Sequence, residues 1–141
     1  MANVIPYAFR GELLSGTHDF ASGGDQFKLA LYTAQPYTTA STVYSATSEV
    51  SASGTNYTTT GNTLAGNAVA YGTAVASCDF SDTSWTSATI TAAFGTIYNS
   101  SASNKVAVVL DFSGDKTCTN GTFTISFPSP STPANAIISM A

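Results

Sequence analysis

The chain has 141 residues, of which 43% are hydrophobic and only 9% are charged, so its surface must be built largely from uncharged polar side chains. Four basic residues stand against eight acidic ones, for a net charge of −4, and they are scattered along the sequence: Arg10, Lys28, Lys105 and Lys116. Direct binding to nucleic acid depends on clustered cations that release counterions, so this composition argues against it.

Membrane insertion and secretion are also disfavoured. No stretch reaches the roughly 18 consecutive apolar residues of a membrane span. The opening residues 1–6 lack the charged and apolar regions of a secretion signal. We therefore expect a protein made and folded in a cytoplasm, where Cys78 and Cys118 are favoured as free thiols over a disulfide.

Residues 6–14 form the one segment with helical character. It begins with a proline, which suits a first helical turn, and Ser15-Gly16 provides a stop. Between them lies an apolar stripe, but the spacing of Tyr7 and Phe9 departs from strict helical periodicity. A short helix is predicted here, with an extended segment as the alternative.

A half-buried strand is predicted at residues 27–33, where apolar side chains alternate with others. Phe27, Leu29 and Leu31 would share its inward face. The following residues, 34–63, are rich in Thr, Ser, Ala and Gly. We interpret them as a long surface excursion that contains one or two short strands.

The second half has more regular strand patterns. Alternation predicts strands at residues 69–71, 75–80, 90–98, 106–112 and 121–127, with a last short strand at 136–140. In the third of these, one face would carry Ile90, Ala92, Phe94, Thr96 and Tyr98. In the fourth, one face would carry Val106, Val108, Leu110 and Phe112. A turn is predicted at residues 113–115.

Short strands separated by turn signals, with little helix, are typical of an all-β fold. We therefore predict one domain over residues 1–141, an antiparallel β-sandwich that is jelly-roll-like, with the short N-terminal helical or extended segment attached.

The sequence offers little to catalysis. His18 is the only histidine; it is followed by Asp19, and no Gly-x-Ser-x-Gly motif is present to place a nucleophile. The spacing of cysteines and histidine does not suit a transition metal. Two carboxylate pairs bracket turns but lack the spacing of a calcium loop: Asp79 with Asp82, and Asp111 with Asp115. We predict a non-enzyme without a cofactor or metal.

The chain holds seven Tyr and eight Phe. Most Phe fall at inward positions of the predicted strands, which indicates a core role. Tyr37, Tyr44 and Tyr57 lie on the excursion instead, and Tyr is favoured at protein interfaces. These three residues are therefore the candidate interface residues.

A series of short segments runs through nearly the whole chain. They are residues 7–16, 27–33, 48–50, 54–57, 61–64, 79–80, 83–85, 88–92, 97–99, 110–112 and 120–125. In this order they resemble small virion proteins encoded by tailed bacteriophages. None of the segments is a catalytic signature, so the resemblance implies a role in assembly on a virion.

Within that family, the resemblance implies a capsid decoration (cement) protein that binds and stabilises the capsid exterior. The implied partner is the major capsid protein or another virion protein, and the implied assembly is a homo-oligomer, in particular a trimer. A tail, neck or fibre-associated protein is the alternative. Two further alternatives are a carbohydrate- or receptor-binding β-sandwich module and a hydrolytic enzyme.

Overall fold

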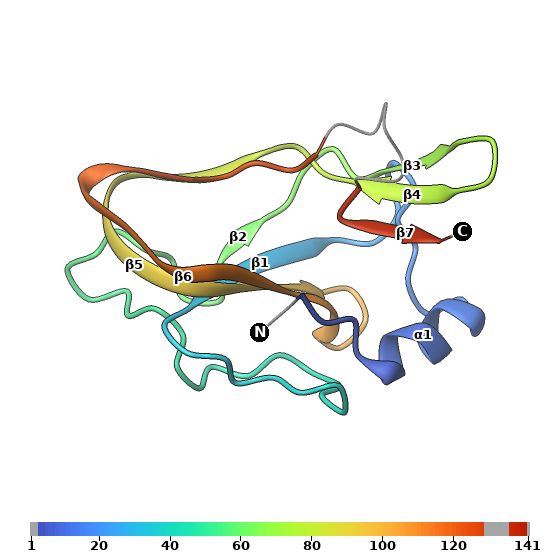
Figure 1. Cartoon of the computed structure of the whole chain (residues 1–141), viewed down its shortest axis with the longest axis horizontal. Helices are drawn as coiled ribbons and strands as arrows, with labels where there is room; N and C mark the ends of the chain where they lie inside the picture. Colours follow the sequence, from blue (N-terminus) through green and yellow to red (C-terminus); the bar gives the residue numbers. More distant parts are fainter. Residues whose placement is uncertain (1–2, 129–135, 141) are drawn as a thin grey trace.

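The computed structural model describes residues 3–128 and 136–140. These residues hold the helix α1 (Tyr7–Leu14) and the strands β1 (Phe27–Tyr32), β2 (Asn62–Thr63), β3 (Ala68–Tyr71), β4 (Ala76–Asp79), β5 (Thr83–Asn99), β6 (Lys105–Ile125) and β7 (Ile138–Met140). The strands pair antiparallel in two sheets, one of order β2-β1-β5-β6 and one of order β3-β4-β7 (Figure 1). The predicted all-β class with one short helix is confirmed, whereas the jelly-roll topology is not.

The long hairpin of β5 and β6 dominates the molecule, and it folds back on itself like an arch (Figure 1). Its pairing continues from Asn99 and Lys105 at one end to Thr83 and Ile125 at the other, interrupted by register shifts. Such shifts are β-bulges, which bend a strand and increase its twist. The bulges therefore let one ribbon serve both as part of the four-stranded sheet and as the layer that returns above it.

The turn predicted at residues 113–115 is wrong, because these residues form the largest bulge of β6 instead. Asp111 still pairs with Phe94, and Lys116 still pairs with Ala92. Ser113 and Gly114 both have positive φ, at 58° and 112°, so they kink the strand without reversing it. The turn-forming residues thus bend β6 within one continuous ladder.

The same irregularities exchange the faces of β5. Ile90 and Ala92 lie in the main core, as predicted. Phe94 and Tyr98 pack instead in a second cluster on the opposite side of the sheet. Because the register shifts between Ala92 and Phe94, the prediction of a single inward face for this strand is wrong.

The faces of β6 are exchanged in the same way. Val106 pairs with Tyr98 and Val108 pairs with Ile97, so Ala107 is an extra residue between them. Val106 consequently packs in the second cluster, while Val108 and Leu110 lie in the main core. The predicted grouping of Val106 with Val108 is therefore wrong.

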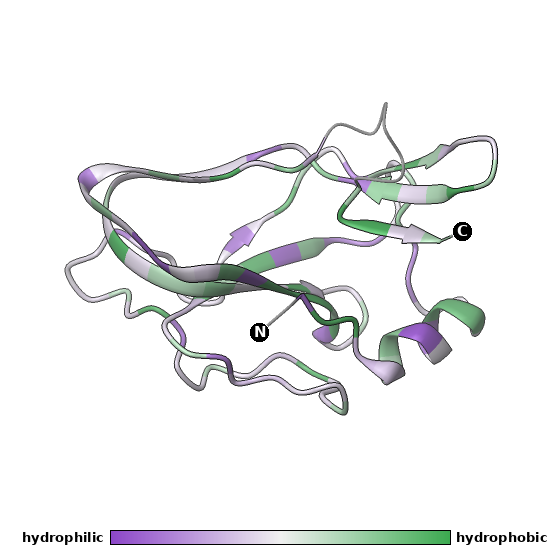
Figure 2. Cartoon of the chain, in the orientation of Figure 1, coloured by the Kyte–Doolittle hydropathy of each residue, from purple (hydrophilic) through white to green (hydrophobic). Residues whose placement is uncertain are grey.

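Strand β1 is buried on both faces, which corrects the prediction of a half-buried strand. Leu29 and Leu31 lie in the main core, and Ala30 and Tyr32 lie in the second cluster. Figure 2 shows the hydrophobic residues concentrated along β1 and the first half of β6, while the excursion is mostly pale. The excursion contributes Tyr37 to the second cluster and Tyr57 to the main core, and isolated bridges such as Tyr32 with residue 49 hold it to the sheet.

One glycine of the excursion tests how tightly it packs on β1. Gly61 has φ +77°, and a Cβ there would lie 1.8 Å from the Leu29 carbonyl oxygen. Gly54 has a similar φ of +70° but nothing within 4 Å. We expect Gly61→Ala to lower the free energy of unfolding by at least about 2 kcal/mol more than Gly54→Ala, measured by urea denaturation. Equal losses would contradict this packing.

Candidate functional site

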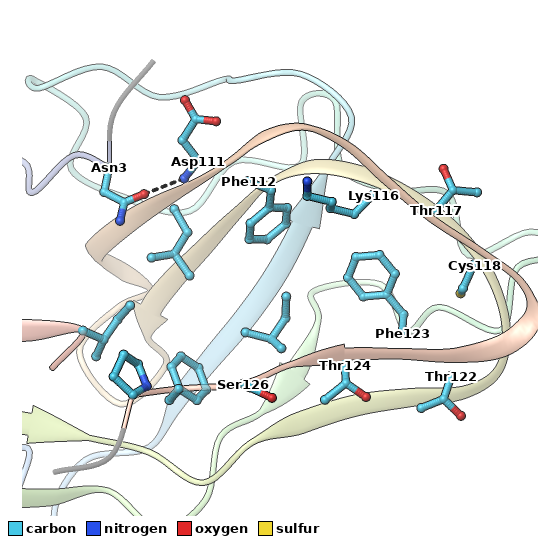
Figure 3. Close-up of a pocket in the computed structure, with 15 residues that line it drawn as sticks. Asn3, Asp111, Phe112, Lys116, Thr117, Cys118, Thr122, Phe123, Thr124 and Ser126 are labelled. Carbon is cyan, nitrogen blue, oxygen red and sulfur yellow. Dashed lines mark hydrogen bonds between the residues drawn. The ribbon is translucent and has the colours of Figure 1, made fainter. Parts of the chain in front are cut away.

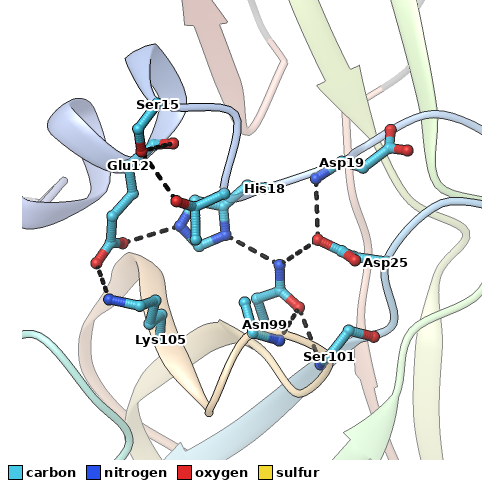
Figure 4. A network of polar contacts seen from close by, with 10 residues as sticks. Glu12, Ser15, His18, Asp19, Asp25, Asn99, Ser101 and Lys105 are labelled. Carbon is cyan, nitrogen blue, oxygen red and sulfur yellow. Dashed lines mark hydrogen bonds and ion pairs between the residues drawn. The ribbon is translucent and has the colours of Figure 1, made fainter.

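A buried polar network joins helix α1 to the four-stranded sheet (Figure 4). The His18 Nε2 lies 2.9 Å from a carboxylate oxygen of Glu12 on α1, and its Nδ1 lies 3.0 Å from the side-chain nitrogen of Asn99 at the end of β5. That nitrogen also donates to Asp25 at 2.7 Å. Lys105, the first residue of β6, forms an ion pair with Glu12. The network therefore connects α1, β5, β6 and the loop before β1.

The hydrogen bonds assign the tautomer of His18. The Asn99 side-chain oxygen accepts from the backbone N–H groups of Ser101 and Ala102, both at 3.0 Å, so its nitrogen must face His18. An amide nitrogen only donates, hence Nδ1 of His18 accepts and the proton lies on Nε2, which donates to Glu12. The imidazole is neutral in this arrangement.

The network holds the His18 ring in place on both sides. The His18 side chain is fully buried, both ring nitrogens are hydrogen-bonded, and the ring packs against Phe9, Phe20 and Phe27. Asp19, its sequence neighbour, does not orient it: Asp19 instead accepts a hydrogen bond from its own loop, at Ala21. A base that acts on a substrate needs a ring nitrogen within reach of that substrate.

The Glu12 carboxylate is the charged member that faces both His18 and Lys105. Burial raises its pKa, but the hydrogen bonds from Lys105 and His18 and the charge of Lys105 together outweigh that effect. The pKa of Glu12 is therefore lowered from its ordinary value of 4.5. The network consequently favours a charged carboxylate.

The three tyrosines predicted as interface residues point toward the sheet. Tyr37 and Tyr57 are only 3% and 4% exposed, and Tyr44 is partly buried. The hydroxyls of Tyr44 and Tyr57 donate to the Glu49 carboxylate at 2.6 and 2.7 Å, and that of Tyr37 pairs with Tyr32 at 2.8 Å. In the single chain they fasten the excursion, so their contact with a partner stays a prediction.

Burial shifts the acidity of this tyrosine cluster. It raises the pKa of the Tyr57 and Tyr44 hydroxyls, and the nearby Glu49 carboxylate raises the pKa of both further. It also raises the pKa of Tyr98 to about 12. These hydroxyls therefore stay protonated and act as hydrogen-bond donors.

An open groove lies inside the bend of the β5–β6 arch, with a volume of 640 Å³ (Figure 3). Two of its lining residues, Leu110 and Phe123, belong to the buried core. Five more are partly buried apolar residues that pack against that core: Phe112, Cys118, Ile125, Phe127 and Ile137. Among the described residues, the groove thus lies directly against the main core.

Sequence reasoning did not find this groove. Its lining comes from the two arms of β6, around Phe112 and around Phe123, which face one another only because β6 bends. The signal that was available is Ser113-Gly114 directly after a strongly apolar strand. That dipeptide was interpreted as a turn, which separates the two arms into different strands.

A smaller cleft of 350 Å³ lies between helix α1 and the three-stranded sheet. It is lined by Leu13 and Phe20 on one side and by Cys78 and Ile138 on the other. At its rim Tyr71 is 84% exposed. Like the groove, the cleft is mainly apolar.

Other kinds of site are not found in the part of the chain that the structure describes. Over residues 3–128 and 136–140, no group of three or more His, Cys, Asp or Glu is placed to hold a metal ion. Within the same residues, no helix has the length and apolar character needed to cross a membrane. Cys78 and Cys118 are free thiols, and burial raises the pKa of Cys78 to about 12.

Comparison of the chain with protein-family models, with curated proteins and with solved structures gives no significant match. The function is therefore argued from the residues and their geometry.

The tyrosine cluster yields a stability prediction. The Tyr57 hydroxyl accepts from the Leu31 backbone N–H at 3.0 Å and donates to Glu49, so Tyr57→Phe leaves a buried N–H without a partner. We expect a loss of about 1–3 kcal/mol in the free energy of unfolding, measured by urea denaturation. Tyr71→Phe, at an exposed site, should change it by less than about 0.5 kcal/mol. An unchanged free energy of unfolding in Tyr57→Phe would contradict the stabilising role of this hydrogen bond.

The network around Glu12 yields a pH prediction. A lowered folded pKa stabilises the fold fully above the ordinary value of 4.5, and this contribution is lost as the pH falls through the folded pKa. We expect Glu12→Gln to cost about 1–2 kcal/mol at neutral pH. The gap to the unaltered protein should narrow in urea unfolding series at about pH 7, 5 and 3. A gap that widens toward acid would refute this assignment.

Proposed function

We propose that the chain is a structural protein of a tailed-phage virion, and specifically a capsid decoration protein that binds the capsid exterior and stabilises it. Its partner is then the major capsid protein or another virion protein, and it acts as a homo-oligomer, in particular a trimer. The proposal is supported by the resemblance that runs through nearly the whole sequence.

The observation that carries an association role is the groove inside the β5–β6 arch. Five partly exposed apolar side chains gather there on a molecule in which only 9% of residues are charged. Exposed apolar patches of this kind mark sites where proteins bind one another. A surface with few charges also limits the desolvation cost when a large area is covered.

The polar chemistry of the described residues supports the same role. His18, which would be the centre of a hydrolytic site, has both ring nitrogens hydrogen-bonded inside the network. The Glu49 carboxylate is likewise bound by two tyrosine hydroxyls. These groups stabilise the scaffold, and the groove inside the arch offers apolar side chains for association.

The proposal predicts abundance on the particle. Quantitative mass spectrometry of purified virions should give a copy number comparable with that of the major capsid protein, because decoration repeats with the capsid lattice. A copy number of only a few per particle would shift the assignment to a tail, neck or fibre component. Absence from the particle would refute a virion role.

A stabilising role predicts a thermal effect. Particles that lack the protein should release their genome at a lower temperature than complete particles, because a bound subunit stabilises the assembled state by mass action. Adding back the purified protein should restore the original temperature. Identical genome retention with and without the protein would count against cementing.

A further inference from the structure

The outer edge of β6 is open beside the groove. β6 is the edge strand of the four-stranded sheet, in the order β2-β1-β5-β6. Among the described segments, residues 112–125 make backbone hydrogen bonds across to β5 and to no other segment. An edge strand with unpaired N–H and C=O groups is a template for another strand.

The first part of this edge already receives an extended segment. Val4 exchanges two backbone hydrogen bonds with Val109, at 2.9 and 2.8 Å. The Asn3 side chain accepts a hydrogen bond from the Asp111 N–H at 2.8 Å (Figure 3). Among the described residues, this edge of β6 therefore already accepts an added strand up to Asp111.

The groove beside this edge offers an apolar floor. Phe112 and Phe123 face one another across it from the two arms of β6 (Figure 3). A strand that pairs along an edge places alternate side chains on one face. An added segment would thus direct every second side chain toward this floor, which is the recognition mode of β-strand addition.

Lys116 is the one basic residue among those that line the groove. The other three cations have partners: Arg10 lies 5.6 Å from the Tyr7 ring centre, Lys28 donates to Thr60, and Lys105 pairs with Glu12. Lys116 lines the groove, is exposed, and has no partner among the described residues.

The one acidic residue that lines the groove is Asp111. Asp111 accepts a hydrogen bond from the Ser113 N–H at 2.8 Å and so is already engaged. A carboxylate on the occupant would complement Lys116.

From these three features we propose that the groove binds an extended segment of a partner protein. The segment pairs with β6 beyond Asp111, has apolar side chains at alternate positions, and places an Asp or Glu side chain against Lys116. The inference deepens the proposed function and depends on it only for the statement that the partner is a virion protein. A row of main-chain groups beside an elongated apolar floor suits a peptide, which supplies matching N–H and C=O groups.

The test is a selection on the purified full chain with a displayed library of random peptides of about 12 residues, which span about 40 Å when extended. Enriched peptides should alternate apolar and other residues and should carry Asp or Glu. Lys116→Glu should weaken their binding by at least roughly tenfold, because it opposes like charges, whereas Lys116→Arg should retain it. Circular dichroism of both variants checks that the fold is unchanged.

The alkylation rates of the two cysteines show where a peptide binds. Cys118 lines the groove and is partly buried, while Cys78 is 5% exposed in the core. A bound peptide should slow the alkylation of Cys118 by at least roughly tenfold, as expected for a site that must open before it reacts. The reactivity of Cys78 should stay unchanged.

Three outcomes would overturn the proposal. They are the absence of enriched peptides, enrichment of peptides that bind Lys116→Glu equally well, and binding that leaves Cys118 alkylation unaffected. Concentration-dependent self-association that Lys116→Glu abolishes would assign the edge to a second copy instead and would also refute it. Because the selection uses no virions, these results are independent of the copy number and heating experiments.

Discussion

The fold depends on the bulges that bend the β5–β6 ribbon. A two-stranded ribbon alone is marginally stable in water, because it has no second layer to cover its apolar face. Here four residues of β6, from Phe112 to Asp115, oppose the single Ala93, and the ribbon turns back over its own sheet. Trp85 and Phe123, which lie in the returning half, are thereby buried against the core at 4% and 7% exposure. The bend also leaves the groove, since the inner side of the arch is not filled completely.

The excursion between β1 and β2 packs on both faces of the sheet, with Tyr57 in the main core and Tyr37 and Tyr44 in the second cluster. Its Ser- and Thr-rich sequence has few apolar residues to cover the second cluster, and it forms few backbone pairs with the sheet. Tyrosine meets both needs, because the ring is apolar and the hydroxyl forms hydrogen bonds. The Tyr57 hydroxyl replaces a strand neighbour for the Leu31 N–H, and Glu49 collects the hydroxyls of Tyr44 and Tyr57.

The sequence predicts those features that depend on local periodicity. The helix Tyr7–Leu14 lies within the predicted residues 6–14, and β1, β3 and β4 lie where alternation indicates them. The faces of β5 and β6 are predicted wrongly, because one inserted residue inverts the alternation and leaves no mark in the composition. A Ser-Gly pair is also equally suited to a turn and to a bulge. The hydrogen-bond partners of His18 and Tyr57 could not be predicted because they are distant in sequence. Asn99 is 81 residues from His18, and Leu31 is 26 residues from Tyr57.

The polar groups at the centre of the molecule differ from those at the arch in how they are hydrogen-bonded. The charged and titratable side chains at the centre of the molecule bind one another: Glu12 with His18 and Lys105, and Glu49 with its tyrosines. Such hydrogen bonds lower the cost of burying polar atoms. In the described part of the chain, an apolar floor, a strand edge and the exposed Lys116 lie together at the arch. Because apolar surface gains free energy when it leaves water, the arch suits the association that we propose.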